Sequence, residues 1–142
     1  MNRQGAKDAK NFVWREPGAA LDDVAHDVIG AAIEVHRLLG PGFLESVYEE
    51  ALCVELSLRN VRFVRQVPVT VSYKRRIVGE SRLDLLVENA LVVELKAVDA
   101  ILPIHVAQVI SYLKAARLRL GLIITFNVDL LKRGIKRVIN TQ

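Results

Sequence analysis

Residues Asp84 to Lys96 are the most informative segment of the chain and read Asp-Leu-Leu-Val-Glu-Asn-Ala-Leu-Val-Val-Glu-Leu-Lys. Two apolar runs on either side of a Glu-Asn turn predict a β-hairpin. Side chains alternate between the faces of a strand, so Glu94 and Lys96 share one face. A three-residue loop at residues 88–90, the commonest kind after two-residue loops, places Asp84 directly across from Glu94. The hairpin therefore gathers two carboxylates and an ammonium on one face.

This register decides the chemistry, because a one-residue slip turns Asp84 to the opposite face. Two carboxylates on a largely buried sheet repel each other and need a partner. Mg²⁺ or Mn²⁺ suits them, since magnesium prefers oxygen ligands and binds through one or two carboxylates plus substrate phosphate. Asp84, Glu94 and the backbone carbonyl of Leu95 are therefore the predicted metal ligands. A bound metal ion activates water and neutralises phosphodiester charge, and Lys96 is expected to assist that water.

A simpler interpretation of the same residues stays open. Glu94 and Lys96 would form an exposed salt bridge, which contributes little to stability. The apolar flanks 91–93 and 97–98 favour a central strand instead, where full exposure is unexpected.

Length and composition predict one domain of residues 18–142, preceded by a flexible arm at residues 1–17 that ends in Pro17-Gly18. The hydrophobic fraction of 51% is enough for a core. The single cysteine, Cys53, excludes an intramolecular disulfide and is expected in the core. No stretch resembles a signal peptide or reaches the ~18 apolar residues of a membrane span, which predicts a cytoplasmic protein with no membrane partner.

Charge is distributed unevenly along the chain. Residues 1–58 carry 5 Lys or Arg against 10 Asp or Glu, whereas residues 59–142 carry 15 against 6. The basic half suits a surface that meets a polyanion such as nucleic acid. An ordinary solvated basic face is the alternative.

Hydrophobic periodicity predicts the order α-α-β-β-β-α-β. The expected helices cover about residues 21–39, 44–58 and 104–116, and the expected strands about 61–73, 77–87, 90–98 and 120–126. The segment from Ile135 to Ile139 is either a last strand or a turn of helix. This order predicts an α/β (α+β) fold, with a mixed central sheet and helices on both faces.

Two patterns resemble a known family. The spacing of Asp84, Glu94 and Lys96 is similar to the signature of the PD-(D/E)XK nuclease superfamily. Gly42-Phe-Leu-Glu45-Ser-Val-Tyr48 resembles the defining motif of the GxxExxY protein family, a branch of that superfamily. The resemblance covers about residues 20–140 and implies a restriction-endonuclease-like core and an Mg²⁺- or Mn²⁺-dependent nuclease.

The chain departs from the family pattern in two places. Leu83-Asp84 stands where the superfamily name has Pro-Asp, and Thr125-Phe126-Asn127 stands where the family tends to have Asn-Phe-Gly. The second difference is expected to alter the loop after the late buried strand.

Further site residues come from the same resemblance. Glu45 and Tyr48 lie three apart on one helix face, so Glu45 either points toward the hairpin or only stabilises the helix N-terminus. Tyr48 correspondingly either orders Glu45 or packs in the core. Gln108 and Tyr112, four apart, resemble a Gln-x-x-x-Tyr word that supports the site or contacts DNA in some branches.

The predicted nucleic-acid contacts are Arg75, Arg76, Arg82, Tyr112 and Lys114. Aromatic residues are scarce in this half, which favours contacts that follow the phosphate backbone over base stacking. So small a domain is expected to gain specificity from a partner or from a homodimer.

The leading hypothesis is a metal-dependent nuclease in which Asp84, Glu94 and Lys96 act with Glu45 and Gln108, on DNA rather than RNA. The second is a nuclease-fold module, weak or inactive, that binds nucleic acid or a protein. The third is an interaction protein whose three charges form a structural ion network.

Overall fold

The computed structural model describes residues 17–141, so the arm expected at residues 1–17 lies outside the described residues except for Pro17. The elements are α1 (Pro17–Leu39), α2 (Glu45–Leu58), β2 (Phe63–Tyr73), β3 (Arg76–Val87), β4 (Leu91–Lys96), α3 (Pro103–Ala116), β5 (Leu120–Thr125), a 3₁₀ turn η1 (Leu131–Gly134) and β6 (Ile135–Ile139). The predicted order is confirmed, and the closing segment is a strand.

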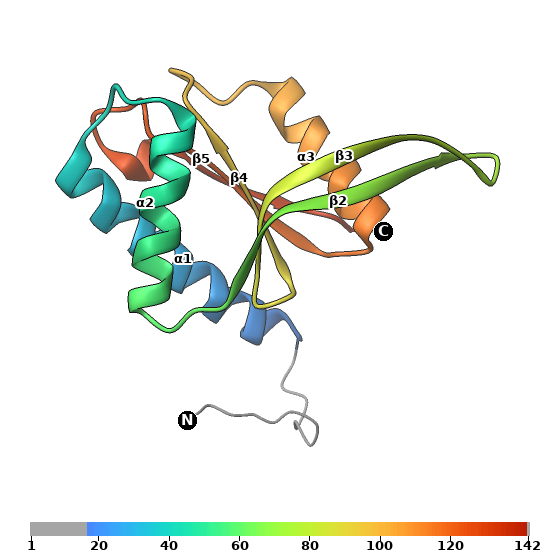
Figure 1. The fold of residues 1–142 in the computed structure, drawn as a ribbon, viewed down its shortest axis with the longest axis horizontal. Coiled ribbons are helices and arrows are strands. Elements are labelled where there is room, and N and C mark those ends of the chain that lie inside the picture. The colour runs from blue at the N-terminus through green and yellow to red at the C-terminus, as the bar shows by residue number, and fades with distance from the viewer. Residues whose placement is uncertain (1–16, 142) are drawn as a thin grey trace.

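The five strands form one sheet in the order β2-β3-β4-β5-β6. Neighbours are antiparallel except β4 and β5, which are parallel and are joined through α3. Helices α1 and α2 cover one face of the sheet and α3 the other (Figure 1). The mixed sheet with helices on both faces is therefore confirmed, with β4 as its middle strand.

Two apolar cores lie on the two faces. The larger packs α1 and α2, through residues such as Val28 and Leu52, against Leu95 and Leu122 of the sheet. The smaller packs α3 against the other face. Cys53 is a buried free thiol in the larger core, as its neighbours predict. No helix among residues 17–141 is both long enough and apolar enough to cross a membrane.

The β3–β4 hairpin has the register predicted from its three-residue loop. Val87 pairs with Leu91 and Leu86 with Val92, while Glu88 and Asn89 take φ angles of 50° and 59° in the loop. The odd loop length therefore holds, through two left-handed residues that are not glycine.

The side chains on the two sides of Asp84 in β3 point to opposite faces of the sheet. Leu83 packs in the core under α3, whereas Leu85 packs in the core under α1 and α2. Residues two apart in a regular strand share a face, so β3 twists sharply between them. The β3–β4 pairing ends at Leu85 and Val93, so the backbone ladder is interrupted at this twist.

The far half of the β2–β3 hairpin, residues 70–80, is exposed along its whole length. Figure 1 shows it projecting from the body of the molecule as a two-stranded ribbon. We call these residues the arm. Its turn is Lys74-Arg75, flanked by the pair Tyr73 and Arg76.

Candidate active site

The candidate site is built where the sheet opens at Asp84. Continuing the register by one step places Asp84 across from Glu94 on β4, and across from Gln66 on β2. Instead of a regular ladder, the two acidic residues bond crosswise. The Asp84 backbone N–H donates to Glu94 Oε1 at 2.9 Å, and the Leu95 N–H donates to Asp84 Oδ2 at 2.8 Å. Each carboxylate thus accepts a backbone N–H that lacks a regular ladder partner, and this hydrogen bond in turn fixes the carboxylate.

Burial and like charge act together on these carboxylates. Glu94 is 4% exposed, and burial, followed by the charge of Asp84, raises its pKa to about 7. The pKa of Asp84 is also raised, mainly by burial, while the Leu95 N–H opposes the shift. The site therefore concentrates more negative charge than it can easily hold at neutral pH.

Glu45, the first residue of α2, faces the same cluster. Burial and the charge of Asp84 raise the pKa of Glu45, whereas Lys96 and the Ala97 backbone lower it. Glu45 is thus near enough to Asp84 and Lys96 for their charges to act on it, and its role in the site stays a prediction.

The Gly-x-x-Glu-x-x-Tyr segment explains how Glu45 is placed. Gly42 has a φ of +109°, a conformation that other residues rarely adopt. Tyr48 is fully buried, stacks on Phe126 with ring centroids 4.4 Å apart, and donates its hydroxyl to Gly40 O at 2.5 Å. The same hydroxyl accepts the Phe43 N–H at 3.2 Å. Tyr48 therefore packs in the core and also fixes the loop that leads into α2.

Lys96 lies beside the carboxylates without pairing to them. Within residues 17–141 no ion pair of 4.0 Å or less joins Lys96 to Asp84 or Glu94. Its Nζ donates instead to Gln108 Oε1 at 3.3 Å, across to α3. The simple Glu94–Lys96 salt bridge is therefore wrong for this structure, and the ammonium remains close enough to lower the pKa of both acids.

Tyr112 lies one turn beyond Gln108 on α3, and it too approaches the acidic cluster. Burial, then the charge of Glu94, raises the pKa of the Tyr112 hydroxyl, which also bonds to Ser81. The four-residue spacing of Gln108 and Tyr112 therefore directs both toward the site.

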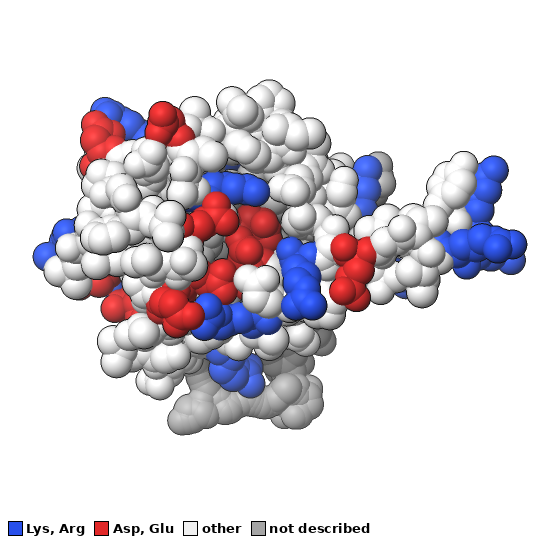
Figure 2. All heavy atoms as spheres, turned by 45° about the horizontal axis from the view of Figure 1, so that its top comes forward, with Lys and Arg blue, Asp and Glu red and all other residues white. Residues whose placement is uncertain are grey.

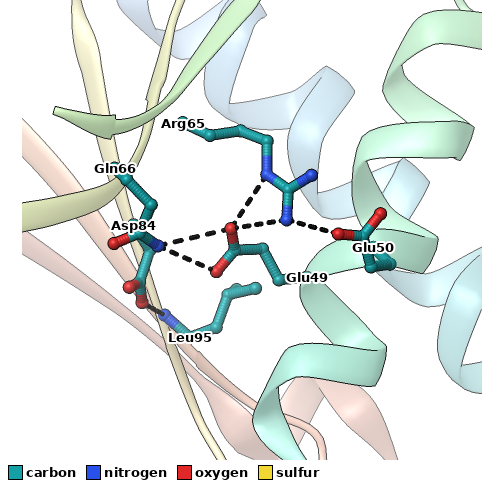
Figure 3. A network of polar contacts seen from close by, with 6 residues as sticks. All are labelled: Glu49, Glu50, Arg65, Gln66, Asp84 and Leu95. Carbon is teal, nitrogen blue, oxygen red and sulfur yellow. Dashed lines mark hydrogen bonds and ion pairs between the residues drawn. The ribbon is translucent and has the colours of Figure 1, made fainter.

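A second polar network adjoins Asp84 on the side of α2 (Figure 3). Gln66 lies beside Asp84, whose pKa it lowers, and donates to both carboxylate oxygens of Glu49, at 3.2 and 3.3 Å. Arg65 holds Glu49 and Glu50, with Nη2–Oε2 distances of 2.9 and 2.7 Å. Glu49 in turn raises the pKa of Asp84 by its charge.

Sequence reasoning missed Glu49 and Gln66. A signal for Glu49 exists, since it lies four residues after Glu45 and so on the same helix face. Gln66 gives no such signal, because its place depends on a φ of 52° in the middle of β2 and on the pairing of that strand.

The basic residues expected to contact nucleic acid do not form one patch. Arg75 and Arg76 lie at the tip of the arm, and Arg82 is exposed on β3 near Asp84. Lys114 lines a separate cavity of about 240 Å³ with Arg117 and Arg119. Figure 2 shows acidic side chains gathered in a hollow with basic side chains beside it, and further basic side chains at the end of the projecting arm.

The departure at residues 125–127 shapes the loop that follows β4. Thr125 exchanges hydrogen bonds with both backbone groups of Val98, and Asn127 Nδ2 donates to Asp99 Oδ1 at 2.5 Å. These contacts hold the segment after Lys96 without involving Asp84 or Glu94.

The donor set fits a hard divalent cation of limited protein coordination. No group of three or more His, Cys, Asp or Glu side chains in residues 17–141 is arranged to hold a metal ion. Two carboxylates and nearby backbone carbonyls supply oxygen only, which suits magnesium with waters and phosphate completing its shell. The raised pKa values of Asp84 and Glu94 show that extra positive charge would be favourable there.

Comparison with known proteins gives one positive finding. No curated protein and no solved structure matches the chain significantly. A family model described as the PD-(D/E)XK nuclease superfamily matches residues 22–138, which spans nearly the whole chain and both strands of the acidic hairpin. Nucleases of this superfamily generally depend on divalent metal ions. The chain therefore belongs to the PD-(D/E)XK nuclease superfamily.

Proposed function

We propose that the protein is a metal-dependent nuclease of the GxxExxY branch that hydrolyses phosphodiester bonds in DNA. The observation that carries the proposal is the pair of Asp84, half-buried, and Glu94, buried, which repel each other and are only partly compensated by Lys96. The superfamily match and the Gly42-x-x-Glu45-x-x-Tyr48 loop support it.

Asp84, Glu94 and the carbonyl of Leu95 would hold Mg²⁺ or Mn²⁺. When bound, the ion would supply Lewis-acid activation and neutralise charge on the phosphate. The backbone bonds to Asp84 and Glu94 fix one oxygen of each carboxylate, so the donors are oriented before substrate arrives.

Lys96 orients the attacking water. Its ammonium also stabilises the negative charge that develops on the phosphate as the water oxygen bonds to phosphorus and the bridging P–O bond breaks. Gln108 acts through Lys96, because its side-chain oxygen accepts the ammonium at 3.3 Å. Glu45 is a positioning residue: its carboxylate faces Asp84 and Lys96 and sets the local charge balance.

Metal binding is tested without cleavage. Titrating Mn²⁺ into the purified protein should raise the melting temperature of the wild type, because a ligand that binds only the folded state stabilises it. Asp84→Ala should abolish the rise. Glu55→Ala, which removes a partly exposed carboxylate elsewhere on α2 that pairs with Arg59, should retain it. An equal rise in all three proteins would contradict the assigned metal ligands.

Catalysis is tested by cleavage of plasmid DNA with Mn²⁺. Lys96→Ala should slow cleavage by on the order of 10²- to 10³-fold, the usual loss when a group that stabilises developing charge is removed. Lys132→Ala, an exposed control in η1, should cleave like the wild type. Metal-dependent stabilisation without any cleavage would favour the alternative, a nuclease-fold module that binds nucleic acid or a protein without turnover.

A further inference from the structure

The arm buries nothing in the described chain. Every residue from 70 to 80 is exposed, and its larger apolar side chains include Tyr73 at 63%, Ile77 at 76% and Val78 at 61%. Neither core includes a residue of this segment. A two-stranded ribbon is marginal on its own in water, so an arm of this kind calls for an external partner.

The arm tip gathers three cations that have no carboxylate partner among the described residues, although Lys74 Nζ lies 5.4 Å from the centroid of the Tyr73 ring. Within residues 17–141 no carboxylate lies within 4.0 Å of the Lys74, Arg75 or Arg76 cations. Some body cations, such as Arg82 and Lys132, likewise have no such partner there, but they do not adjoin one another. Six body arginines do have such partners, namely Arg37, Arg59, Arg62, Arg65, Arg133 and Arg137. Three adjacent positive charges without counter-charge complement a polyanion.

The turn itself is built at a cost. Lys74 and Arg75 have φ angles of 49° and 68°, so both central residues of this two-residue turn are left-handed. Such turns favour Asn-Gly, because a residue with a Cβ atom adopts this region only at an energetic cost. The sequence places charge where a neutral pair would form the turn more easily, which points to a use for that charge.

The dimensions of the arm match one groove of DNA. Paired strands lie about 4.8 Å apart, and the major groove of B-DNA, about 12 Å wide, admits a two-stranded ribbon directly, whereas proteins that enter the minor groove of about 6 Å commonly kink the duplex. We infer that the arm seats in the major groove of duplex DNA, with Lys74, Arg75 and Arg76 on phosphates. This inference rests on the proposed nuclease function, which it extends to the form of the substrate.

The length of the arm limits how far from the site its tip can contact the duplex. Arg76 precedes Asp84 by eight residues on β3, which is up to about 26 Å at roughly 3.3 Å per residue. B-DNA rises about 3.4 Å per base pair, so the tip meets the duplex up to about eight base pairs from the bond at the site. The exposed Ile77 and Val78 adjoin the β-bulge opposite Val71 and Ser72 and supply apolar surface close to the tip, which suits the methyl group that thymine presents in the major groove.

The test uses a variant designed to fold. Lys74→Asn with Arg75→Gly installs the favoured turn pair and removes two charges, so it should be at least as stable as the wild type. Its affinity for a fluorescein-labelled 24-base-pair DNA, measured by anisotropy in EDTA, should fall by on the order of 10- to 60-fold near 0.1 M salt. The plot of log affinity against log salt has a negative slope, and its magnitude should fall by about 2.

A matched control separates position from charge. Arg59→Ala with Arg62→Ala removes the same net charge at the opposite end of β2, where both arginines pair with glutamates. That variant should bind nearly like the wild type. Equal weakening of the two variants, or no weakening of the turn variant, would overturn the inference.

The groove is tested with an A-form duplex. The deep, narrow major groove of double-stranded RNA does not admit a ribbon, so the turn variant and the wild type should bind a 24-base-pair RNA alike. An equal loss on RNA would overturn the major-groove assignment. A loss of self-association in the turn variant, seen by sedimentation, with DNA affinity unchanged would assign the arm to a second copy of the chain instead.

Failure of the inference and failure of the proposed function give different results. Binding in EDTA does not require turnover, so arm-dependent binding by a protein that never cleaves would reject only the nuclease. Metal-dependent cleavage that is indifferent to the turn variant would reject only the arm.

Discussion

The two ends of the β2–β3 hairpin differ in the environment of their charged side chains. At its base, around Asp84, charges are buried or held: Arg65 pairs with two glutamates, and each acid at the sheet opening accepts a backbone N–H. At its tip, Lys74 and Arg75 face solvent without a carboxylate partner in the described chain. The base presents oxygen donors to the proposed metal ion and the tip presents cations to the proposed polyanion, so one continuous hairpin links the proposed chemistry to the proposed substrate.

The sharpest contrast is kinetic. Asp84→Asn keeps the side-chain shape but removes a charge from the base, and it should lower kcat for duplex cleavage by about 10³-fold or more. The turn variant Lys74→Asn with Arg75→Gly should act chiefly through KM. Steady-state cleavage of a labelled duplex separates the two effects. A fall in kcat of the same size in both variants would remove the division between base and tip.

Stability should divide the same strand in the same way. Leu85 is fully buried, and Leu85→Ala should lower the free energy of unfolding by about 2–5 kcal/mol. Ile77, 76% exposed on the same strand, should cost less than about 1 kcal/mol when changed to Ala. Urea unfolding measures both. A large loss at Ile77 would mean that the arm packs against something in the isolated protein.

The base should also respond to pH. The pKa of Glu94 rises from its ordinary 4.5 to about 7 on folding, so the folded protein binds this proton more readily than the unfolded chain. The contribution of Glu94 to stability is therefore greatest below pH 4.5 and is lost as pH rises to about 7, by up to about 3 kcal/mol. Above that range it is constant.

Glu94→Gln isolates this contribution. The variant keeps an oxygen acceptor for the Asp84 N–H, and its stability should decline less than that of the wild type between pH 5 and pH 8. Thermal unfolding across this range makes the comparison. Parallel curves for the two proteins would show that Glu94 does not carry the raised pKa.

The smallest expected difference compares two arginines. Arg65→Ala breaks the ion pairs with Glu49 and Glu50, whose partly exposed geometry predicts a loss of about 0.5–1 kcal/mol. Arg75→Ala breaks none in the described chain and should leave the free energy of unfolding within about 0.5 kcal/mol of the wild type. Denaturant titrations resolve the pair, and a reversal of this order would indicate a partner for Arg75 that the structure does not show.

The β3–β4 hairpin, which carries Asp84 and Glu94, is more predictable from sequence than the arm of the β2–β3 hairpin. Apolar runs of fixed length around Glu88-Asn89 constrain the register, because any slip would bury charge or expose leucine. That constraint is local, so it predicts the pairing across Leu86 and Val92 correctly.

The outer part of β2, which leads into the arm, has no such local constraint. Val67, Val69 and Val71 alternate as a half-buried strand does, yet only Val69 is buried, and Val71 is 40% exposed. Alternation describes a strand that could cover a core, and whether a helix reaches far enough to cover it is a property of the whole fold. The position of Gln66 beside Asp84 depends on the same tertiary information.

The crosswise bonds at the sheet opening have a spectroscopic consequence. Because the Leu95 N–H is bound to the Asp84 carboxylate and the Asp84 N–H to the Glu94 carboxylate, each amide resonance should shift when its acid gains or loses a proton. A nitrogen-15 NMR titration of these two backbone signals would then follow each acid separately. The protein thus carries its own pair of reporters for ionisation at the centre of the sheet.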